Sequence, residues 1–183
     1  MKPEYFGDID KLYGNVQCSE ISTVKRMFPQ ERDWTCALAC FRTLLKSVGI
    51  TINEENLIEV CDIQIGPKNS SDVKRWAGVL KLDKQIRYGC DHRYINKKSA
   101  NLLHELLRSH NVMLEVMLNY AHWIVVLAYY KMGELRDDTM VIYDPYYDKI
   151  RLFPAEEILS MWYAAGDNTK DRDFVAILKD GGN

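Results

Sequence analysis

Two cysteines stand four residues apart at the start of an apolar stretch, in the segment QERDWTCALACFRTLLKSVG (residues 30–49). Such a pair can be part of a metal site, a pair of buried apolar side chains, or a nucleophile with its neighbour. A structural zinc site takes four ligands, usually in two close pairs. The other cysteines and His92, His104 and His110 offer no second pair at a suitable spacing. The sequence therefore predicts neither a metal site nor another cofactor.

The two cysteines differ in their expected positions on a helix. Apolar residues recur at three- and four-residue steps from Cys36 to Val48, which predicts a helix that ends at Gly49. Cys40 lies inside the apolar stripe, so we expect a buried core residue. Cys36 lies in the first turn, where unpaired N–H groups and the positive end of the helix dipole favour a thiolate. Cys36 is therefore the candidate nucleophile, provided that a base lies nearby.

A histidine and an aspartate stand at the ends of two predicted strands. His122 opens the strand HWIVVLAYY, and Asp144 follows the strand TMVIY with Pro145 directly behind it. Neighbouring antiparallel strands can bring an imidazole and a carboxylate together, and the carboxylate then fixes the tautomer and orientation of the ring. Taken alone, His122 is an ordinary strand-end residue and Asp-Pro a common turn opener. Together with Cys36, the two residues form a candidate Cys-His-Asp set for acyl transfer.

Gln30 and three aromatic residues complete the candidate site. Gln30 lies six residues before Cys36, so its amide can donate a hydrogen bond to an oxyanion formed beside the thiolate. Trp34, Trp123 and Tyr146 lie next to the catalytic candidates in the sequence. Most aromatic residues in such positions are packing residues or cleft walls. We nevertheless predict that these three contact the substrate.

The elements that must position these residues change in character along the chain. Helices are predicted over 36–48, 53–60, from 70 or 71 to 80, over 98–108 and over 154–162, and strands over 112–118, 122–130, 139–144, 148–153 and 173–178. Asp33 or Thr35 is expected to cap the first helix. Helices come first and strands later, without a βαβ rhythm or a repeat, which predicts an α+β fold with N-terminal helices packed on a C-terminal antiparallel sheet. Residues 1–28 are interpreted as a lead-in and residues 29–183 as a single domain.

Composition narrows the class of protein. The chain has 183 residues, of which 47% are apolar and 27% charged, and its formal charge is −2, as in an ordinary globular protein without a general attraction to nucleic acid or to a membrane surface. No apolar run is long enough to cross a bilayer, and the N-terminus lacks the apolar core of a signal peptide. The expected location is the cytoplasm, although export without a signal would leave no mark in the sequence. There the five cysteines are expected to be thiols.

The motifs taken together resemble the C39 and C39-like cysteine peptidases of the papain-like superfamily. The segment QERDWTCALAC is similar to the glutamine and nucleophile segment of that family, and HWIVVLAYY to its histidine strand. The segment VIYDPYYDKIRLFPAEEILSMW resembles its Asp-Pro strand with the following hairpin and helix, and SSDVKRWAGVL resembles the short helix between the two halves. The resemblance spans residues 29–178 and implies a papain-like fold.

The resemblance also implies roles for individual residues. Cys36 corresponds to the nucleophile, His122 to the base, Asp144 to the residue that orients the base, and Gln30 to the oxyanion donor. The implied activity is cleavage of a peptide or protein substrate, without a cofactor. The sequence departs from the family pattern at three residues: Ala37 and Ala121 stand where glycine is common, and Thr35 stands where aspartate is usual.

Three other functions use the same residues or the same scaffold. A Cys-His-Asp site can deamidate a glutamine, or transfer the acyl group to an amine instead of water. A papain-like scaffold can also act as a binding module without catalysis. Trp34 and the ending WYAAGDNTKDRDFVAIL resemble the eukaryotic guanylyl cyclase domain-containing proteins, whose name implies a nucleotide chemistry that the site does not suggest. The segment GPKNSSD lacks a phosphate-loop pattern and is interpreted as a helix-capping loop.

Overall fold

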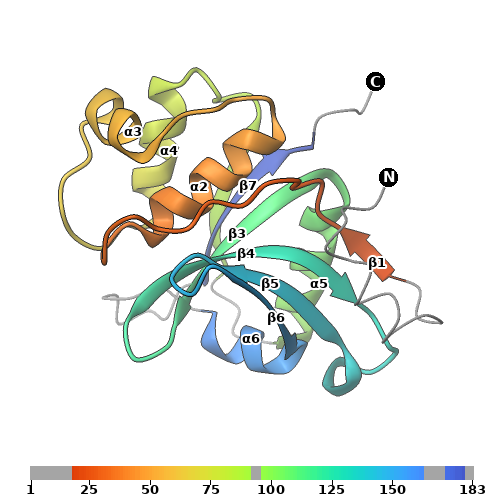
Figure 1. Ribbon diagram of the computed structural model, residues 1–183. Helices are drawn as coiled ribbons and strands as arrows, with labels where there is room; N and C mark the ends of the chain where they lie inside the picture. The colour runs from red at the N-terminus through yellow and green to blue at the C-terminus, as the bar shows by residue number, and fades with distance from the viewer. Residues whose placement is uncertain (1–17, 92–95, 163–171, 180–183) are drawn as a thin grey trace.

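The computed structural model describes residues 18–91, 96–162 and 172–179, which form an antiparallel sheet with helices on both faces (Figure 1). Six strands follow the order β2-β7-β3-β4-β5-β6, and β1 pairs with β4 beside them. The strands are β1 (Cys18–Ile21), β2 (Ile86–Asp91), β3 (His110–Met117), β4 (Ala121–Tyr130), β5 (Thr139–Asp144), β6 (Lys149–Pro154) and β7 (Arg172–Leu178).

The helices cover the two faces of the sheet in separate groups. They are α2 (Cys36–Ser47), α3 (Glu54–Cys61), α4 (Ser70–Val79), α5 (Asn96–Ser109) and α6 (Ala155–Met161), with a short 3₁₀ helix η2 (Leu135–Asp137) before β5. Helices α2, α3 and α4 pack on one face, and α5 and α6 lie on the other (Figure 1). Each face therefore has its own hydrophobic core.

The central strand β4 contributes to both cores. Val125 and Leu127 point into the core beneath α2, whereas Ile124 and Val126 point into the core beneath α5 and α6. A strand that is buried on both faces needs apolar residues at every position, not only at alternate ones. This requirement explains why β4 is an almost continuous apolar run.

Helix α2 begins at Cys36 without the side-chain cap that the sequence predicts. Thr35 occupies the N-cap position, but its hydroxyl makes no capping hydrogen bond. The Thr35 Oγ1 instead donates to the carbonyl of Arg32 at 2.9 Å and accepts the N–H of Arg32 at 3.0 Å. The prediction of a cap by Asp33 or Thr35 is therefore wrong, because the Thr35 side chain closes the preceding turn.

The end of α2 agrees with the sequence prediction. Gly49 has a φ of +81°, in the left-handed region that glycine adopts at little cost. Its N–H donates to the carbonyl of Lys46 at 3.3 Å, and the N–H of Ile50 donates to the carbonyl of Leu45 at 3.0 Å. These bonds satisfy carbonyl groups that the end of the helix leaves open.

The predicted elements and the α+β class are confirmed, with differences at their edges. The segregation into N-terminal helices and a C-terminal sheet is incomplete, because β1 lies within the predicted lead-in and pairs with β4, and β2 pairs with β7. The 3₁₀ helix was not expected. Residues 66–72 do lead into α4, where Asn69 and Asp72 form a capping box. Some predictions concern residues outside the described ones. These are residues 1–17 of the lead-in, His92, and residues 163–171 of the segment WYAAGDNTKDRDFVAIL.

Candidate active site

Cys36 and Cys40 occupy different environments one helical turn apart on α2. Cys36 is the first residue of the helix and is only half-buried, whereas Cys40 is fully enclosed in the core. Burial, together with the charges of Cys36 and Asp144, raises the pKa of the Cys40 thiol well above its usual value. Cys40 is thus an inert core residue, and Cys36 is the accessible member of the pair. Both are free thiols, as is Cys61.

His122 and Asp144 lie side by side at one end of the sheet. His122 follows the first residue of β4, Asp144 ends β5, and the two strands are antiparallel neighbours. The His122 Nε2 and the Asp144 Oδ1 are 2.9 Å apart, and both side chains are nearly inaccessible to water. The N–H of Tyr146 also donates to the Asp144 Oδ1, at 3.0 Å. The turn after Asp-Pro therefore fixes the carboxylate that holds the imidazole.

The protonation of His122 depends on both Asp144 and Cys36. Burial alone would lower the pKa of His122, but hydrogen bonds to Asp144 and Cys36 and their charges raise this pKa to about 9. Burial would likewise raise the pKa of Asp144, but the hydrogen bond and charge of His122 and the N–H groups of Tyr146 and Tyr147 lower it. At neutral pH the ring is therefore an imidazolium between two groups that stabilise its charge.

Gln30 lies next to the Asp-Pro turn. Its backbone N–H donates to the carbonyl of Pro145 at 3.1 Å, which joins the segment before α2 to the turn after β5. The Gln30 Nε2 donates to the carbonyl of Arg32 at 3.0 Å. A side-chain amide carries two N–H donors, so one remains for a ligand. The buried Gln30 Oε1 has no hydrogen-bond partner among the described residues.

A buried charged network holds the segment between Gln30 and α2. The Glu54 Oε2 accepts the N–H of Glu31 at 3.2 Å, whereas the Glu54 Oε1 is buried without a hydrogen-bond partner among the described residues. The guanidinium of Arg42 on α2 lies 2.7 Å from the Glu31 carboxylate and 3.6 Å from that of Glu54. Burial raises the pKa of Glu54 above its usual value. These contacts fix the backbone that ends at Cys36.

Sequence reasoning missed Glu54 and Arg42 because their residue types carry no sign of burial. Glu54 stands in the first turn of α3, where an acidic residue is expected on the surface. Yet its side chain is 1% exposed and that of Arg42 is 6% exposed. The only sign of a buried charge in the sequence is that Arg42 interrupts the apolar run of α2. This interruption does not indicate which residue pairs with Arg42.

The predicted substrate contacts are placed very differently by the structure. Tyr146 is exposed, and Trp34 is half-buried with the Lys68 ammonium 5.7 Å from the centre of its ring. Trp123 is 1% exposed, and its Nε1 donates to the carbonyl of Lys68 at 2.8 Å. That Trp123 contacts the substrate stays a prediction; in the structure its indole is held in the core. Its ring supports the loop that carries Lys68, from within the core.

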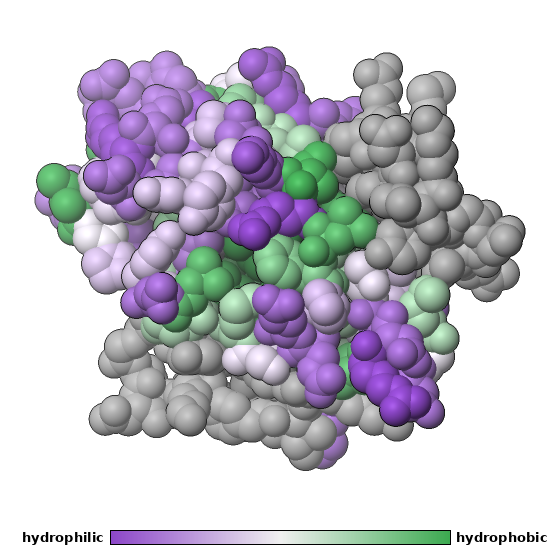
Figure 2. Space-filling view, turned by 60° about the horizontal axis from the view of Figure 1, so that its bottom comes forward, coloured by the Kyte–Doolittle hydropathy of each residue, from purple (hydrophilic) through white to green (hydrophobic). Residues whose placement is uncertain are grey.

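Two further tyrosines border the site. Tyr120 precedes β4, and its ring meets that of His122 edge-on, with centroids 5.9 Å apart. Tyr147 lies beside Tyr146, with centroids 5.0 Å apart in a T-shaped arrangement. On the face of the molecule shown in Figure 2, hydrophobic side chains gather near the centre among hydrophilic ones. Exposed aromatic residues beside a reactive group are typical of a binding surface.

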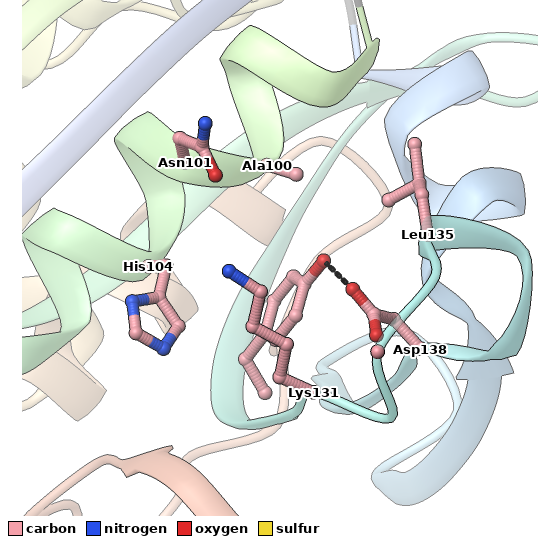
Figure 3. Close-up of a pocket in the computed structure, with 8 residues that line it drawn as sticks. Ala100, Asn101, His104, Lys131, Leu135 and Asp138 are labelled. Atoms are coloured by element: carbon pink, nitrogen blue, oxygen red, sulfur yellow. Dashed lines mark hydrogen bonds between the residues drawn. The ribbon is translucent and has the colours of Figure 1, made fainter.

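A small pocket of about 120 Å³ lies elsewhere, between α5 and the connection from β4 to β5 (Figure 3). Asn101, His104 and Lys131 line it, together with Tyr129 and Asp138. The Tyr129 hydroxyl donates to Asp138 at 2.7 Å, and the N–H of Met132 donates to the same carboxylate at 2.8 Å. Asp138 is thus engaged in holding the connection. The pocket belongs to the core beneath α5, across the sheet from α2.

Two general features complete the description. Within residues 18–91, 96–162 and 172–179, no cluster of three or more His, Cys, Asp or Glu side chains is arranged to hold a metal ion. Over the same residues, every helix is too short or too polar to cross a bilayer.

The fold is similar to that of a known peptidase domain. The structure is similar to the peptidase domain of Streptococcus ComA, a bi-functional ABC transporter involved in a quorum-sensing pathway, with a TM-score of 0.56. The alignment covers 84% of this chain and 97% of that domain, at 16% sequence identity. No protein-family model matches the sequence, and no curated protein is significantly similar to it. At this identity the likeness concerns the fold. It supports the resemblance to C39 peptidases at that level.

Proposed function

We propose that the protein is a cysteine peptidase, with Cys36 as nucleophile, His122 as base and acid, and Asp144 as the residue that orients the ring. The observation that carries the proposal is the buried pair of His122 and Asp144, whose Nε2 and Oδ1 atoms are 2.9 Å apart, together with the accessible Cys36, which is close enough to raise the pKa of His122. The likeness of the fold to a peptidase domain supports it. The papain-like fold, in the detailed sense, is part of this proposal.

In the proposed reaction the Cys36 thiolate attacks the carbonyl carbon of a peptide bond. The C–S bond forms as the carbonyl π electrons move to the oxygen. Collapse of this oxyanion expels the amine, which takes its proton from the His122 imidazolium. His122, now neutral, then removes a proton from water, which attacks the thioester. The acid is released, and the proton returns to the Cys36–His122 pair.

Oxyanion stabilisation is assigned to the segment that the buried network holds. The N–H groups in the first turn of α2 have no helical partner, and one N–H of the Gln30 amide remains available. Both kinds of donor belong to the stretch of chain that leads into and begins α2. Donors of this kind stabilise the charge that develops on the carbonyl oxygen in the transition state.

Mass spectrometry in H₂¹⁸O tests the proposal and separates its alternatives. The protein is incubated with a mixture of tryptic and chymotryptic peptides, and the Cys36→Ser variant serves as the control. Hydrolysis incorporates ¹⁸O into new C-terminal carboxylates, and we expect such products only with the wild type. Incorporation into glutamine side chains would instead indicate deamidation, and peptide–amine conjugates would indicate acyl transfer.

If no product forms, and Cys36 also fails to form an acyl-enzyme with an activated peptide ester, the hypothesis of an enzyme is contradicted. The protein is then better explained as a non-catalytic binding module. Products of equal amount in the wild type and in Cys36→Ser would contradict the assignment of the nucleophile. Each outcome therefore chooses among the functions that the residues allow.

A further inference from the structure

Three exposed tyrosines converge beside His122 from two separate turns. Tyr120 comes from the turn between β3 and β4, and Tyr146 and Tyr147 come from the turn between β5 and β6. Their side chains are 47%, 50% and 52% exposed, respectively. The Tyr120 ring meets the His122 ring edge-on, the Tyr146 N–H donates to the Asp144 carboxylate that holds His122, and the Tyr147 ring packs against that of Tyr146. We call Tyr120, Tyr146 and Tyr147 the tyrosine cluster.

The position of His122 assigns this cluster to one side of the scissile bond. In the proposed reaction the imidazolium gives its proton to the departing amine, which requires the leaving group to lie within hydrogen-bond reach of the ring. Because the Tyr120 ring contacts the His122 ring edge-on, a leaving group that reaches His122 passes beside Tyr120.

We propose that the tyrosine cluster is the leaving-group subsite and that it selects peptides with an aromatic side chain directly after the scissile bond. The proposal rests on the proposed function of Cys36 and His122 and names the substrate class of that site. The same subsite binds the incoming amine when the acyl group passes to an amine instead of water, because the acceptor occupies the place that the leaving group has left.

The chemistry of the cluster fits a planar, electron-rich partner. Tyr146 and Tyr147 already meet at 79°, an edge-to-face arrangement that a third ring can extend. The guanidinium of Arg151 lies 5.6 Å from the centre of the Tyr147 ring, which limits the freedom of that ring. A tyrosine also has few rotatable bonds, so ordering it on binding costs little entropy. The exposed rings thus offer an arranged aromatic surface at the mouth of the site.

The test uses peptides that share one acyl part and differ in the first leaving-group residue, phenylalanine or alanine. For the wild type we expect kcat/KM to be about tenfold higher with phenylalanine, the size of effect that an aromatic contact and its buried area give. The Tyr120→Ala variant should reduce this ratio to about twofold. Tyr120→Phe should keep it, because the ring remains. Tyr88→Ala is the matched control, since Tyr88 is an exposed tyrosine on β2.

The ratio separates substrate selection from a purely structural role. If Tyr120 only held His122 in place, Tyr120→Ala would slow both peptides equally and leave the ratio unchanged, which would overturn the proposal. The Tyr146→Ala variant gives the same test from the other turn. A second measurement is the partition of the acyl-enzyme between phenylalanine amide and alanine amide, which should favour phenylalanine amide about tenfold in the wild type.

The outcomes also distinguish this inference from the proposed function. An acyl-enzyme that forms on Cys36 with a wild-type ratio near one would overturn the leaving-group subsite and leave the peptidase intact. Failure of every peptide and every activated ester to acylate Cys36 would overturn both. A tenfold preference that persists in both alanine variants would place the selective surface away from the tyrosine cluster.

Discussion

At the scale of single residues, burial separates two cysteines of identical chemistry. Cys36 and Cys40 share one helix, yet only Cys36 has access to solvent and to His122. Cys40 is enclosed, and burial raises its pKa, so it remains a thiol. The difference follows from one helical turn. The first turn of α2 emerges at the end of the sheet where β4 begins and β5 ends, whereas the second turn lies over the core.

Substitution of the two cysteines should have opposite consequences. We expect Cys36→Ser to lower kcat by more than about a thousandfold with little change in stability, because only the nucleophile is lost. Cys40→Ser should retain the reaction and lower the free energy of unfolding by about 1–3 kcal/mol, because it buries a hydroxyl in an apolar core. Peptide hydrolysis and urea unfolding measure the two effects. Loss of activity in Cys40→Ser at full stability would contradict the assignment.

The raised pKa of His122 predicts the alkaline limit of activity. The imidazolium supplies the proton for the leaving group, so kcat/KM should fall as the pH rises through about 9. The Asp144→Asn variant removes the carboxylate that stabilises the imidazolium, and its alkaline limit should therefore move to a lower pH. Initial rates from pH 5 to pH 10.5 give both profiles. An unchanged limit in Asp144→Asn would show that Asp144 does not set the charge of the ring.

At the scale of the elements, the segment before α2 is fixed by charges from two helices. Glu54 at the start of α3 binds the N–H of Glu31, and Arg42 of α2 binds both carboxylates. Gln30, at the other end of the segment, is bound to the turn after β5. The segment between Gln30 and Cys36 is thus held by α2, by α3 and by the sheet. Its conformation does not depend on its own sequence alone.

Removal of the buried carboxylate should destabilise the protein more than removal of an exposed one. We expect Glu54→Ala to lower the free energy of unfolding by about 3 kcal/mol, because a buried guanidinium loses one of its partners. Glu54→Gln should cost less, since an amide oxygen can still accept the N–H of Glu31 and Arg42 keeps the Glu31 carboxylate as a partner. The control is Glu55→Ala, an exposed neighbour, with an effect within about 0.5 kcal/mol. Equal effects in Glu54→Ala and Glu55→Ala would contradict the role of the network.

At the scale of the whole molecule, the sheet separates two cores, and the candidate site lies at one end of it. The core beneath α2 to α4 surrounds Cys40, and the core beneath α5 and α6 includes Trp162, whose Nε1 donates to the carbonyl of Asp173 on β7. His122 and Asp144 are joined through β4 and β5, which face both cores. The ion pair of His122 and Asp144 therefore joins two strands that contribute to both cores.

The His122 pKa links the stability of the protein to pH. The folded-state pKa of about 9 exceeds the ordinary value of 6.5. The protonated His122 therefore makes its full contribution to the free energy of unfolding below pH 6.5, and this contribution is lost as the pH rises through about 9. The difference between the two pKa values corresponds to about 3 kcal/mol of stability. Urea unfolding should show this loss between pH 6 and pH 9.5 in the wild type and not in His122→Asn. An equal loss in the variant would assign the linkage to other groups.

Much of the fold could be predicted because local patterns determine it. The three- and four-residue periodicity of α2 and the dense apolar runs of β3, β4 and β5 fix both the type and the place of these elements. Strand β1 could not be predicted in the same way, because its pairing with β4 is a contact between distant segments. The mutual position of His122 and Asp144 could be predicted from the ends of two strands that follow each other in the chain.

The remaining features of the site depend on tertiary contacts. The burial of Trp123 and Glu54 arises from how the loop of Lys68 and helix α3 pack, and the residue types do not indicate it. Tyr120 carries no motif of its own, since its role follows from the turn that brings it against His122. Sequence patterns thus predict which residues can react. The packing determines which residues surround them.

The central claim is that Cys36 and His122 form a reactive pair, and the most direct measurement is the rate of Cys36 alkylation by iodoacetamide as a function of pH. An ordinary thiol titrates near 8.5, so its alkylation is slow at pH 6. With peptide mapping, we expect fast labelling of Cys36 at pH 6 in the wild type, loss of that reactivity in His122→Ala, and no labelling of Cys40 in the native protein. Cys36 labelling that follows an ordinary thiol titration in the wild type, or that is unchanged in His122→Ala, would contradict the account.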